Sequence, residues 1–370
     1  MELQQMRTWA EIDLGAIEHN YKAMRDRLPF GTRFLGVVKA NAYGHGAARV
    51  SRVLERAGCE YLGVACLSEA VQLREEGLGL PILILGHTPG EYTPILLEHG
   101  ITQAVCGLEA AEAYSRAARG ASLNVHIKLD TGMGRLGEWT TDELERAMAL
   151  PGLRVEGIFT HFAESEADGG DFTRGQLASF LSRTGDLEKK TGRPFKIKHC
   201  ANSGAVINYK DTWLDMVRPG IALYGYYPGR ATGGVELRPA MQLKSRVMQV
   251  KRIAKGDTVS YGRRYTAPGD AVIAVLPVGY ADGLHRALSG KINVLINGRR
   301  APQVGAICMD ACMADVTGIP GVTEGSVATV FGADGDERIF ADRLAAEAGT
   351  ISHEMLTSIS GRVPRIYRDA

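Results

Sequence analysis

The chain has 370 residues, of which 45% are hydrophobic and 23% charged, and its formal net charge is +1. This length and composition suit one large domain with a smaller one beside it. The near-zero charge argues against nucleic acid or an anionic membrane as a partner. No apolar run approaches the roughly 20 residues of a membrane span, and the N-terminus lacks the features of a secretory signal. We therefore expect a cytoplasmic protein.

The cysteines do not form a recognisable binding motif. The chain has six of them, and the pair Cys308 and Cys312 lacks the spacing of a zinc site. Most lie in apolar runs, where cysteine behaves as a small buried hydrophobic residue. We expect reduced cysteines and no bound metal.

Short apolar runs alternate with amphipathic segments over residues 1–235. The alternation is typical of an α/β protein, and the number of runs equals the eight strands of a (β/α)8 TIM-like barrel. The predicted strands are Phe34–Lys39, Tyr61–Leu67, Ile82–Gly86, Ile101–Cys106, Asn124–Asp130, Val155–His161, Lys196–Asn202 and Met216–Gly220. The predicted helices between them include Glu69–Glu76, Leu108–Arg119, Thr141–Leu150 and Gln176–Lys190.

Lys39 ends the first of these apolar runs. A lysine there is desolvated, so its pKa falls and more of it is the neutral amine that attacks carbonyl groups. Lys39 is therefore a candidate Schiff-base lysine. The alternative is a lysine that extends to solvent or pairs with a carboxylate at the strand end.

Polar residues gather at the carboxyl ends of the predicted strands, where barrel enzymes have their active sites. They are Lys39, Lys128, Asp130, His161, His199, Asn202, Ser203 and Arg218. The segments 201–205 and 219–222 follow the last two strands, at the position where barrels commonly bind phosphate. A reactive lysine together with a phosphate site indicates pyridoxal 5'-phosphate.

Residues 236–370 have a different pattern, with short apolar runs separated by Gly, Pro, Asp and Asn. This pattern predicts a mainly β domain. The predicted strands are Val247–Ile253, Val259–Tyr261, Ala271–Pro277, Ile292–Ile296, Pro302–Ile307 and Ser326–Phe331, and a helix is predicted at Asp342–Ala348.

Eight segments, in order through both regions, resemble the alanine racemase family, which is pyridoxal-phosphate-dependent and of fold type III. They are Val38–Gly46, Lys128–Gly137, Thr160–Ala163, Ala201–Ser203, Arg218–Gly225, Val259–Gly262, Val278–Gly283 and Cys308–Asp310. One such motif is weak evidence, but the series covers nearly the whole chain.

The resemblance implies a homodimer in which the β domain of each subunit completes the partner's active site. Lys39 would hold the cofactor as an internal aldimine and act as the base on one face of the alanine Cα. Tyr261 would be the base on the opposite face, activated by a network through His161 and Arg218. Arg218 would donate to the pyridine nitrogen of the cofactor and leave it unprotonated.

Further residues match family positions. The resemblance assigns cofactor binding to Tyr43, His161, Asn202, Ser203, Gly220, Ile221 and His353, and substrate contact to Arg135, Met309, Asp310 and Tyr280. Lys128 matches a lysine that is carbamylated in many members, where the carbamate positions Arg135. The alternative is an ordinary lysine paired with Asp130.

Two positions depart from the common family pattern. His353 stands where a phosphate-contacting tyrosine is usual, and Ala306 replaces a frequent arginine of the substrate entrance. Relatives with a polar residue at the first position include some that favour serine, so a serine or serine/alanine racemase is an alternative to an alanine racemase. A cofactor carrier without catalysis and a decarboxylase on a related barrel are further alternatives, although neither needs Tyr261.

Overall fold

The computed structural model describes residues 7–166 and 170–369, and the chain divides into two compact units. The barrel unit contains Ile17–Ala42 and Gly46–Arg238. The β unit combines the N-terminal segment through Ala16, the short stretch Tyr43–His45 and the chain from Pro239 onward. The division therefore does not follow the sequence in one cut at residue 235, because an N-terminal strand and a three-residue stretch both pack with the C-terminal part.

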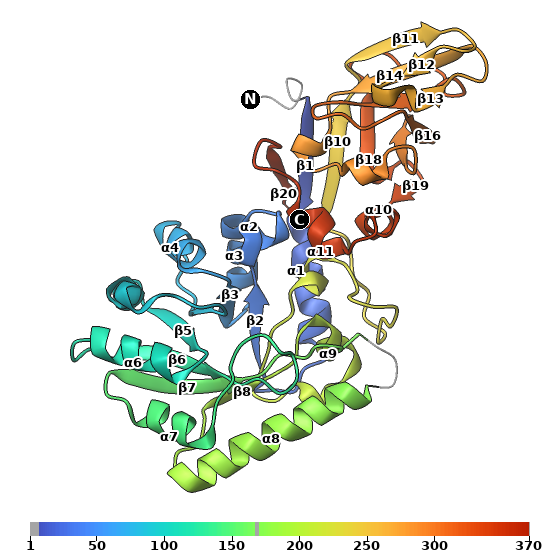
Figure 1. The fold of residues 1–370 in the computed structure, drawn as a ribbon. Coiled ribbons are helices and arrows are strands. Elements are labelled where there is room, and N and C mark those ends of the chain that lie inside the picture. Colours follow the sequence, from blue (N-terminus) through green and yellow to red (C-terminus); the bar gives the residue numbers. More distant parts are fainter. Residues whose placement is uncertain (1–6, 167–169, 370) are drawn as a thin grey trace. The chain divides into compact units, whose positions relative to one another are not determined.

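The barrel unit is built on a closed barrel of parallel strands, β2 to β9 (Figure 1). They are β2 (Arg33–Val37), β3 (Tyr61–Val64), β4 (Ile82–Ile84), β5 (Ile101–Val105), β6 (Leu123–Lys128), β7 (Leu153–Phe159), β8 (Ile197–His199) and β9 (Met216–Val217). Pairing of β2 with β9 closes the ring. The predicted (β/α)8 barrel is confirmed, and each of its strands overlaps a predicted run.

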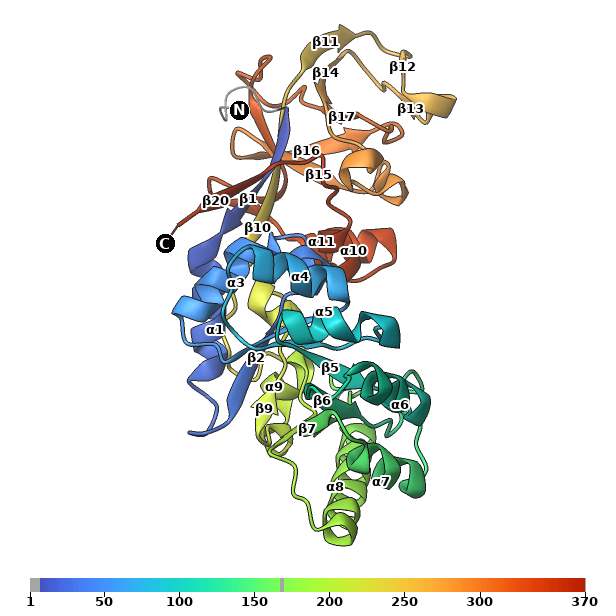
Figure 2. The same cartoon turned by 90° about the vertical axis from the view of Figure 1, so that its left-hand side faces the viewer.

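Helices lie outside the barrel strands, as the view in Figure 2 shows for α3 to α8. Their bounds are α1 (Leu14–Arg25), α3 (Ala47–Arg56), α4 (Leu67–Glu75), α5 (Thr93–Glu98), α6 (Leu108–Ala117), α7 (Thr141–Ala149), α8 (Asp171–Thr191) and α9 (Ser203–Asn208). Among the described residues, no helix has the length and apolar character needed to cross a bilayer.

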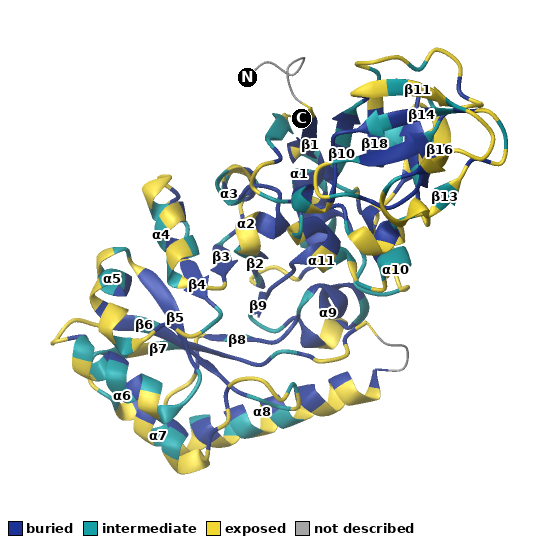
Figure 3. Cartoon of the chain, turned by 45° about the horizontal axis from the view of Figure 1, so that its top comes forward, coloured by how far each residue is buried: buried dark blue, intermediate teal, exposed yellow. Residues whose placement is uncertain are grey.

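Local sequence explains where these helices start and stop. Thr140 and Glu143 form a reciprocal capping box at the start of α7, which satisfies backbone donors that a helix leaves unpaired. Gly192 ends α8 in the left-handed conformation, with φ 66°. Buried and exposed residues alternate along α8 (Figure 3), because only one of its faces packs on the barrel.

The β unit contains one large sheet with the strand order β11-β14-β17-β16-β15-β18-β10-β1-β20. Its strands are β1 (Thr8–Asp13), β10 (Met241–Arg246), β11 (Gln249–Ile253), β14 (Ala271–Leu276), β15 (Asn293–Ile296), β16 (Arg299–Val304), β17 (Cys312–Asp315), β18 (Val327–Asp334) and β20 (Arg365–Arg368). The smaller pair β12 (Thr258–Val259) and β13 (Tyr265–Thr266) stands apart, and β19 (Glu337–Ile339) pairs with β18.

The mainly β character of the C-terminal region is confirmed, and the predicted helix at Asp342–Ala348 is α10 (Ala341–Ala348). The sequence patterns do not reveal α11 (Ser352–Thr357) or the strands β1, β10, β13, β17, β19 and β20. β1 runs antiparallel to β10 and parallel to β20, so the two ends of the chain meet in this sheet.

Candidate active site

Lys39 follows β2 and begins an unusual turn, α2 (Lys39–Tyr43). Ala40, Asn41, Ala42 and Tyr43 have φ values between 51° and 54°, which is the left-handed helical region. Left-handed helix costs roughly 1–2 kcal/mol for each residue with a side chain. Such strain in successive residues persists only where the surrounding structure enforces it, and it is concentrated at functional sites.

The environment of Lys39 favours its neutral form. Its side chain is partly buried. Burial, followed by the nearby Arg135 guanidinium, lowers the pKa of Lys39, and Glu69 opposes the shift. The Glu69 carboxylate accepts hydrogen bonds from the amides of Ala40 (2.6 Å) and Ala65 (2.8 Å), so it fixes the start of the turn. These features fit the predicted Schiff-base lysine better than an ion-paired one.

Lys128, at the end of β6, is only 3% exposed. Burial, followed by repulsion from Arg218, lowers its pKa to about 8. Its Nζ donates to the carbonyl of Leu129 at 3.0 Å. The ion pairs found among the described residues do not include a direct Lys128–Asp130 contact, although the charge of Asp130 opposes the fall in the pKa of Lys128.

Asp130 instead organises the loop that carries Arg135. Its carboxylate accepts hydrogen bonds from the backbone amides of Gly132, Met133 and Arg135 at 2.7, 2.9 and 3.0 Å. Although burial opposes ionisation, these amides hold the pKa of Asp130 below its usual range. The Arg135 side chain is exposed at the mouth of the barrel unit.

Arg218 is a buried cation of the barrel unit, with 3% exposure. It donates to Nδ1 of His199 at 2.8 Å and to the carbonyls of Thr160 (2.7 Å) and Cys200 (3.2 Å). Its guanidinium also lies 3.3 Å from Nδ1 of His161. Burial lowers the pKa of Arg218 to about 10, so the side chain stays protonated at neutral pH.

His161 lies in the same cluster as a neutral group. Burial, then the charges of Arg218, Arg135, Lys128 and Lys39, lowers its pKa well below the usual value. The predicted set Lys39, Lys128, Arg135, His161 and Arg218 is therefore electrostatically coupled in the barrel unit.

The loops after β8 and β9 are joined through Ser203. Its hydroxyl accepts hydrogen bonds from the amides of Gly220 (2.9 Å) and Ala222 (3.3 Å). Asn202 caps α9, accepting from the Ala205 amide at 3.1 Å, and its Oδ1 also accepts from Ser165 at 2.6 Å. Asn202 thus has a structural task in addition to the predicted one.

This donor set fits a phosphorylated aldehyde cofactor. A lysine of lowered pKa suits the aldehyde, and Ser203 with the loop containing Gly220 and Ile221 suits a phosphate. Arg218 is buried, and no ion pair among the described residues joins it to a carboxylate within 4 Å. Such a guanidinium suits a neutral acceptor, for example an unprotonated ring nitrogen.

Tyr261 stands on a strained turn of the β unit and begins a short 3-10 segment, not the end of a strand. The residue before it, Ser260, has φ 70° and ψ −179°, a region normally restricted to glycine. The Ser260 hydroxyl donates to the carbonyl of Ala306 at 2.7 Å, which ties the turn to the loop after β16. The Tyr261 ring is 73% exposed.

Tyr280, Met309 and Asp310 lie on two loops that hydrogen-bond to each other in the β unit. The Tyr280 amide donates to the carbonyl of Cys308 at 3.0 Å. Asp310 accepts from Arg362 at 2.7 Å, and Arg362 also bonds the buried carboxylate of Asp282 at 2.7 and 3.0 Å. Arg362 and Asp282 were not predicted. Asp282 lies within the motif Val278–Gly283, and only its polar character could have indicated a structural role.

Tyr43 and His353 belong to the β unit, where their ring centroids lie 5.8 Å apart. Burial raises the pKa of the Tyr43 phenol above its usual value. Ala306, the other atypical position, is 1% exposed and uses its carbonyl to hold Ser260.

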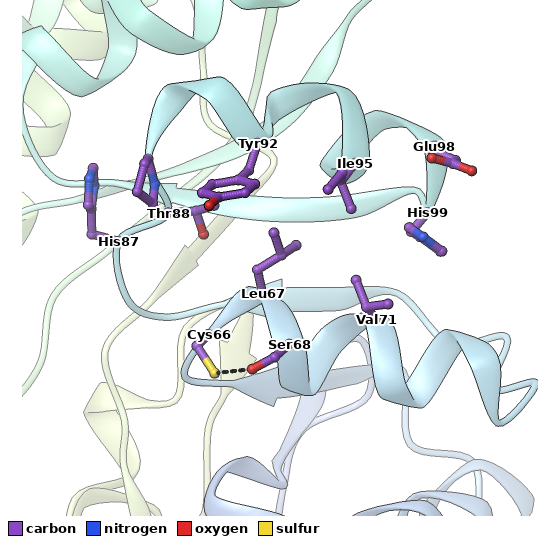
Figure 4. A pocket seen from close by; sticks show the side chains of 11 residues that line it. Cys66, Leu67, Ser68, Val71, His87, Thr88, Tyr92, Ile95, Glu98 and His99 are labelled. Atoms are coloured by element: carbon purple, nitrogen blue, oxygen red, sulfur yellow. Dashed lines mark hydrogen bonds between the residues drawn. The ribbon is translucent and has the colours of Figure 1, made fainter.

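A separate pocket of about 580 Å³ lies between α4 and α5 (Figure 4). Its walls are mainly apolar and include Leu67, Val71, Tyr92 and Ile95. None of the residues that line it belongs to the predicted site, so we do not assign it to the reaction.

Comparisons with known proteins agree with this geometry. A family model described as "Alanine racemase, N-terminal domain" matches residues 12–228, and one described as "Alanine racemase, C-terminal domain" matches residues 240–367. The chain belongs to the alanine racemase family. The resemblance seen in the sequence motifs is thereby confirmed.

Full-length relatives of this family are similar to the chain. An alanine racemase from Desulfosudis oleivorans is 45% identical, over 97% of this chain and 96% of its own. A solved alanine racemase from Clostridium difficile 630 is 38% identical with a TM-score of 0.93, covering 99% of this chain and 96% of its own. The alanine racemase structure from Bacillus anthracis with bound L-Ala-P is 36% identical, also with a TM-score of 0.93, covering 98% and 95%.

Proposed function

We propose that this member of the alanine racemase family interconverts L-alanine and D-alanine with pyridoxal 5'-phosphate, using Lys39 and Tyr261 as the two bases. The observation that carries the proposal is Lys39 itself. It is a partly buried lysine of lowered pKa, held by a strained turn at the carboxyl end of a barrel strand. A cytoplasmic location remains a prediction from the sequence.

The bound cofactor would acidify the substrate Cα by withdrawing electrons from it. The Lys39 amine would take or return the Cα proton on one face. The Tyr261 phenol would do so on the other face. Two groups are needed because a proton removed from one face must be replaced on the opposite face to invert the centre.

Arg218 and His161 would set the electrostatics of this exchange. A protonated Arg218 donates but does not accept a proton, so an acceptor facing it stays unprotonated. Burial and four nearby cations keep His161 neutral. A neutral imidazole would form a hydrogen bond with the phenol of Tyr261 without placing a further positive charge beside it.

Lys128 would be carbamylated. Carbamylation requires the neutral amine, and a pKa of about 8 leaves an appreciable fraction neutral near pH 7. A carbamate here would be an anion among Arg218, Arg135 and His161, and its charge would offset the buried cations. It would also give the Arg135 loop an anionic neighbour.

The active form would be a homodimer with shared sites. Tyr261, Tyr280 and Met309 expose 73%, 42% and 53% of their surface on the β unit. A base and two substrate-contacting residues need a barrel mouth beside them to act, and a second copy of the chain would supply it.

Optical rotation of L-alanine solutions tests the proposal. The purified holoenzyme should abolish the rotation without releasing carbon dioxide. A decarboxylase would release carbon dioxide, and a non-catalytic cofactor carrier would leave the rotation unchanged. Tyr261→Phe should reduce turnover of both enantiomers at least 100-fold, because it removes one of the two proton-transfer groups. Full activity of Tyr261→Phe with both enantiomers would contradict the two-base scheme.

Serine is a second candidate substrate because of His353. Its imidazole lies beside Tyr43 at the position where the family usually has tyrosine. We expect measurable racemisation of L-serine beside L-alanine, and a shift of the kcat/KM ratio towards alanine in His353→Tyr. Parallel kinetics on both amino acids measure the ratio. Serine turnover more than about a thousandfold below alanine would remove serine from consideration.

A further inference from the structure

Arg218 is a buried cation whose hydrogen bonds go to neutral acceptors. They are Nδ1 of His199, Nδ1 of His161 and the carbonyls of Thr160 and Cys200. Within the described part of the chain, no ion pair joins Arg218 to a carboxylate. A buried charge without a counter-charge is strongly disfavoured. The polar groups that hydrogen-bond to the partners of Arg218 therefore affect how well its charge is stabilised.

Two buried imidazoles continue from Arg218 into the barrel. His199 on β8 and His126 on β6 are both 0% exposed, and Nε2 of His199 lies 2.8 Å from Nδ1 of His126. The His199 ring stacks on Phe159 with centroids 4.8 Å apart, which fixes its plane. The three side chains therefore form a continuous row across the barrel interior.

The direction of the hydrogen bonds in this row follows from Arg218. A guanidinium only donates, so Nδ1 of His199 must be the unprotonated nitrogen. Burial is the largest cause that lowers the pKa of both histidines, so each is neutral and carries one ring proton. His199 must then carry its proton on Nε2 and donate it to Nδ1 of His126. His126 in turn must carry its proton on Nε2.

Glu156 on β7 lies where that last proton points. Its Oε2 is 3.8 Å from Nε2 of His126 and 3.4 Å from the hydroxyl of Tyr61. The first distance is too long for a direct hydrogen bond, and Nε2 of His126 has no other hydrogen-bond partner among the described atoms. A protonated Nε2 is attracted to the carboxylate, whereas a lone pair there would be repelled.

We propose that Glu156 is a positioning residue for Arg218, acting through His126 and His199. Its charge stabilises the Nε2-protonated tautomer of His126, and through it the same tautomer of His199, whose Nδ1 then stays available as the acceptor that Arg218 requires. If the tautomers reversed, a protonated Nδ1 of His199 would face the Arg218 donors and push the guanidinium away. The proposal rests on the proposed function only in the role given there to Arg218.

The test compares Glu156→Met with Glu188→Met in the holoenzyme. Glu188 on α8 is a matched control, because it is also partly buried and it pairs with Lys198 at 3.3 Å, while none of its hydrogen bonds or ion pairs reaches His126 or His199. NMR of the ¹⁵N-labelled histidine ring nitrogens reports the tautomers directly. We expect unprotonated Nδ1 in the rings of His126 and His199 of the wild type, a changed tautomer distribution in these two rings in Glu156→Met, and no change in Glu188→Met.

Activity gives a second readout. Glu156→Met should lower kcat on L-alanine about tenfold with little change in KM, because Arg218 loses its orientation while the substrate contacts remain. Glu156→Gln keeps the shape of the side chain but removes its charge, and the 3.8 Å distance is too long for a direct hydrogen bond, so it should change the tautomers and lower kcat as Glu156→Met does. Unchanged tautomers in Glu156→Met, or wild-type tautomers and kcat in Glu156→Gln, would overturn the proposal.

His126→Asn and His126→Leu form an independent pair. The Asn side-chain oxygen can replace Nδ1 as an acceptor for His199, whereas Leu offers none. We expect His126→Asn to keep the wild-type tautomer of His199 and to be severalfold more active than His126→Leu. Equal tautomer distributions and equal activities in the two variants would contradict the proposed action through His126 and His199. The NMR readout does not depend on racemisation, so it tests this action even if alanine is not the substrate.

Discussion

At the scale of single residues, burial lowers the pKa of two lysines of the barrel. Lys39 and Lys128 both lose part of their preference for the charged form because they are desolvated beside other cations. The sequence indicated both, since each ends an apolar run. It did not indicate His126 and Glu156, because a histidine inside a buried strand and a glutamate two residues before Ile158 have no sequence pattern that distinguishes them from structural residues.

Lys128 makes stability dependent on pH. Its pKa falls from 10.5 to about 8 in the folded state, so folding disfavours its protonated form below pH 8. The penalty, about 3 kcal/mol, is complete below pH 8 and disappears as pH rises through 8 to 10.5. Without bicarbonate, Lys128→Met should therefore raise the free energy of unfolding at pH 7 and show a smaller gain at pH 10.

Urea unfolding at both pH values and at one protein concentration measures this difference. Bicarbonate supplies the matched condition, because a carbamate on Lys128 replaces the unfavourable cation with an anion. Wild-type stability at pH 7 should then rise towards that of Lys128→Met. A variant that is less stable than wild type without bicarbonate would show that the ammonium form of Lys128 is not destabilising.

At the scale of elements, the barrel was predictable and the β unit only in part. Eight apolar runs separated by amphipathic segments specify a parallel barrel, since each strand is buried on both faces. The strands β1 and β20 escaped prediction because their partners lie at the opposite end of the chain. The turn at Tyr261 escaped for another reason, since Ser260 adopts a conformation that its residue type does not favour.

The Tyr261 turn depends on Gly305. A Cβ at Gly305, whose φ is 71°, would lie 2.8 Å from the carbonyl oxygen of Val259 and 2.9 Å from Cβ of Ser260. Gly305→Ala should therefore displace the turn and lower kcat at least tenfold, while the sheet stays folded. Gly298→Ala is the control, because its φ is 70° but its Cβ would approach only the Asp334 carbonyl, at 4.0 Å.

Steady-state kinetics and thermal unfolding of the two variants separate placement from stability. Both variants bear the strain of a left-handed alanine, about 1 kcal/mol in unfolding free energy, and the close contacts at Gly305 should add a further loss there. Only Gly305→Ala should lose activity. Equal kcat values for the two variants would mean that the position of the Tyr261 turn does not limit the reaction.

At the scale of the whole molecule, the proposal requires two copies of the chain. Lys39 belongs to the barrel unit and Tyr261 to the β unit. In a dimer with shared sites, each site would combine Lys39 of one subunit with Tyr261 of the other. Two inactive variants, Lys39→Ala and Tyr261→Phe, should then complement each other.

Random mixing of the two variants in equal amounts, by unfolding and refolding together, should give about half heterodimers. Each heterodimer would have one site with both substitutions and one intact site, so about a quarter of the wild-type activity should return. Sites formed within single chains would restore no activity.

Mixing wild type with the double variant Lys39→Ala/Tyr261→Phe supplies the reverse test. In shared sites, each site of a heterodimer would contain one substituted residue, so the heterodimer would be inactive and the mixture should have about a quarter of the activity of wild type at the same total concentration. Sites within single chains should leave about half of that activity.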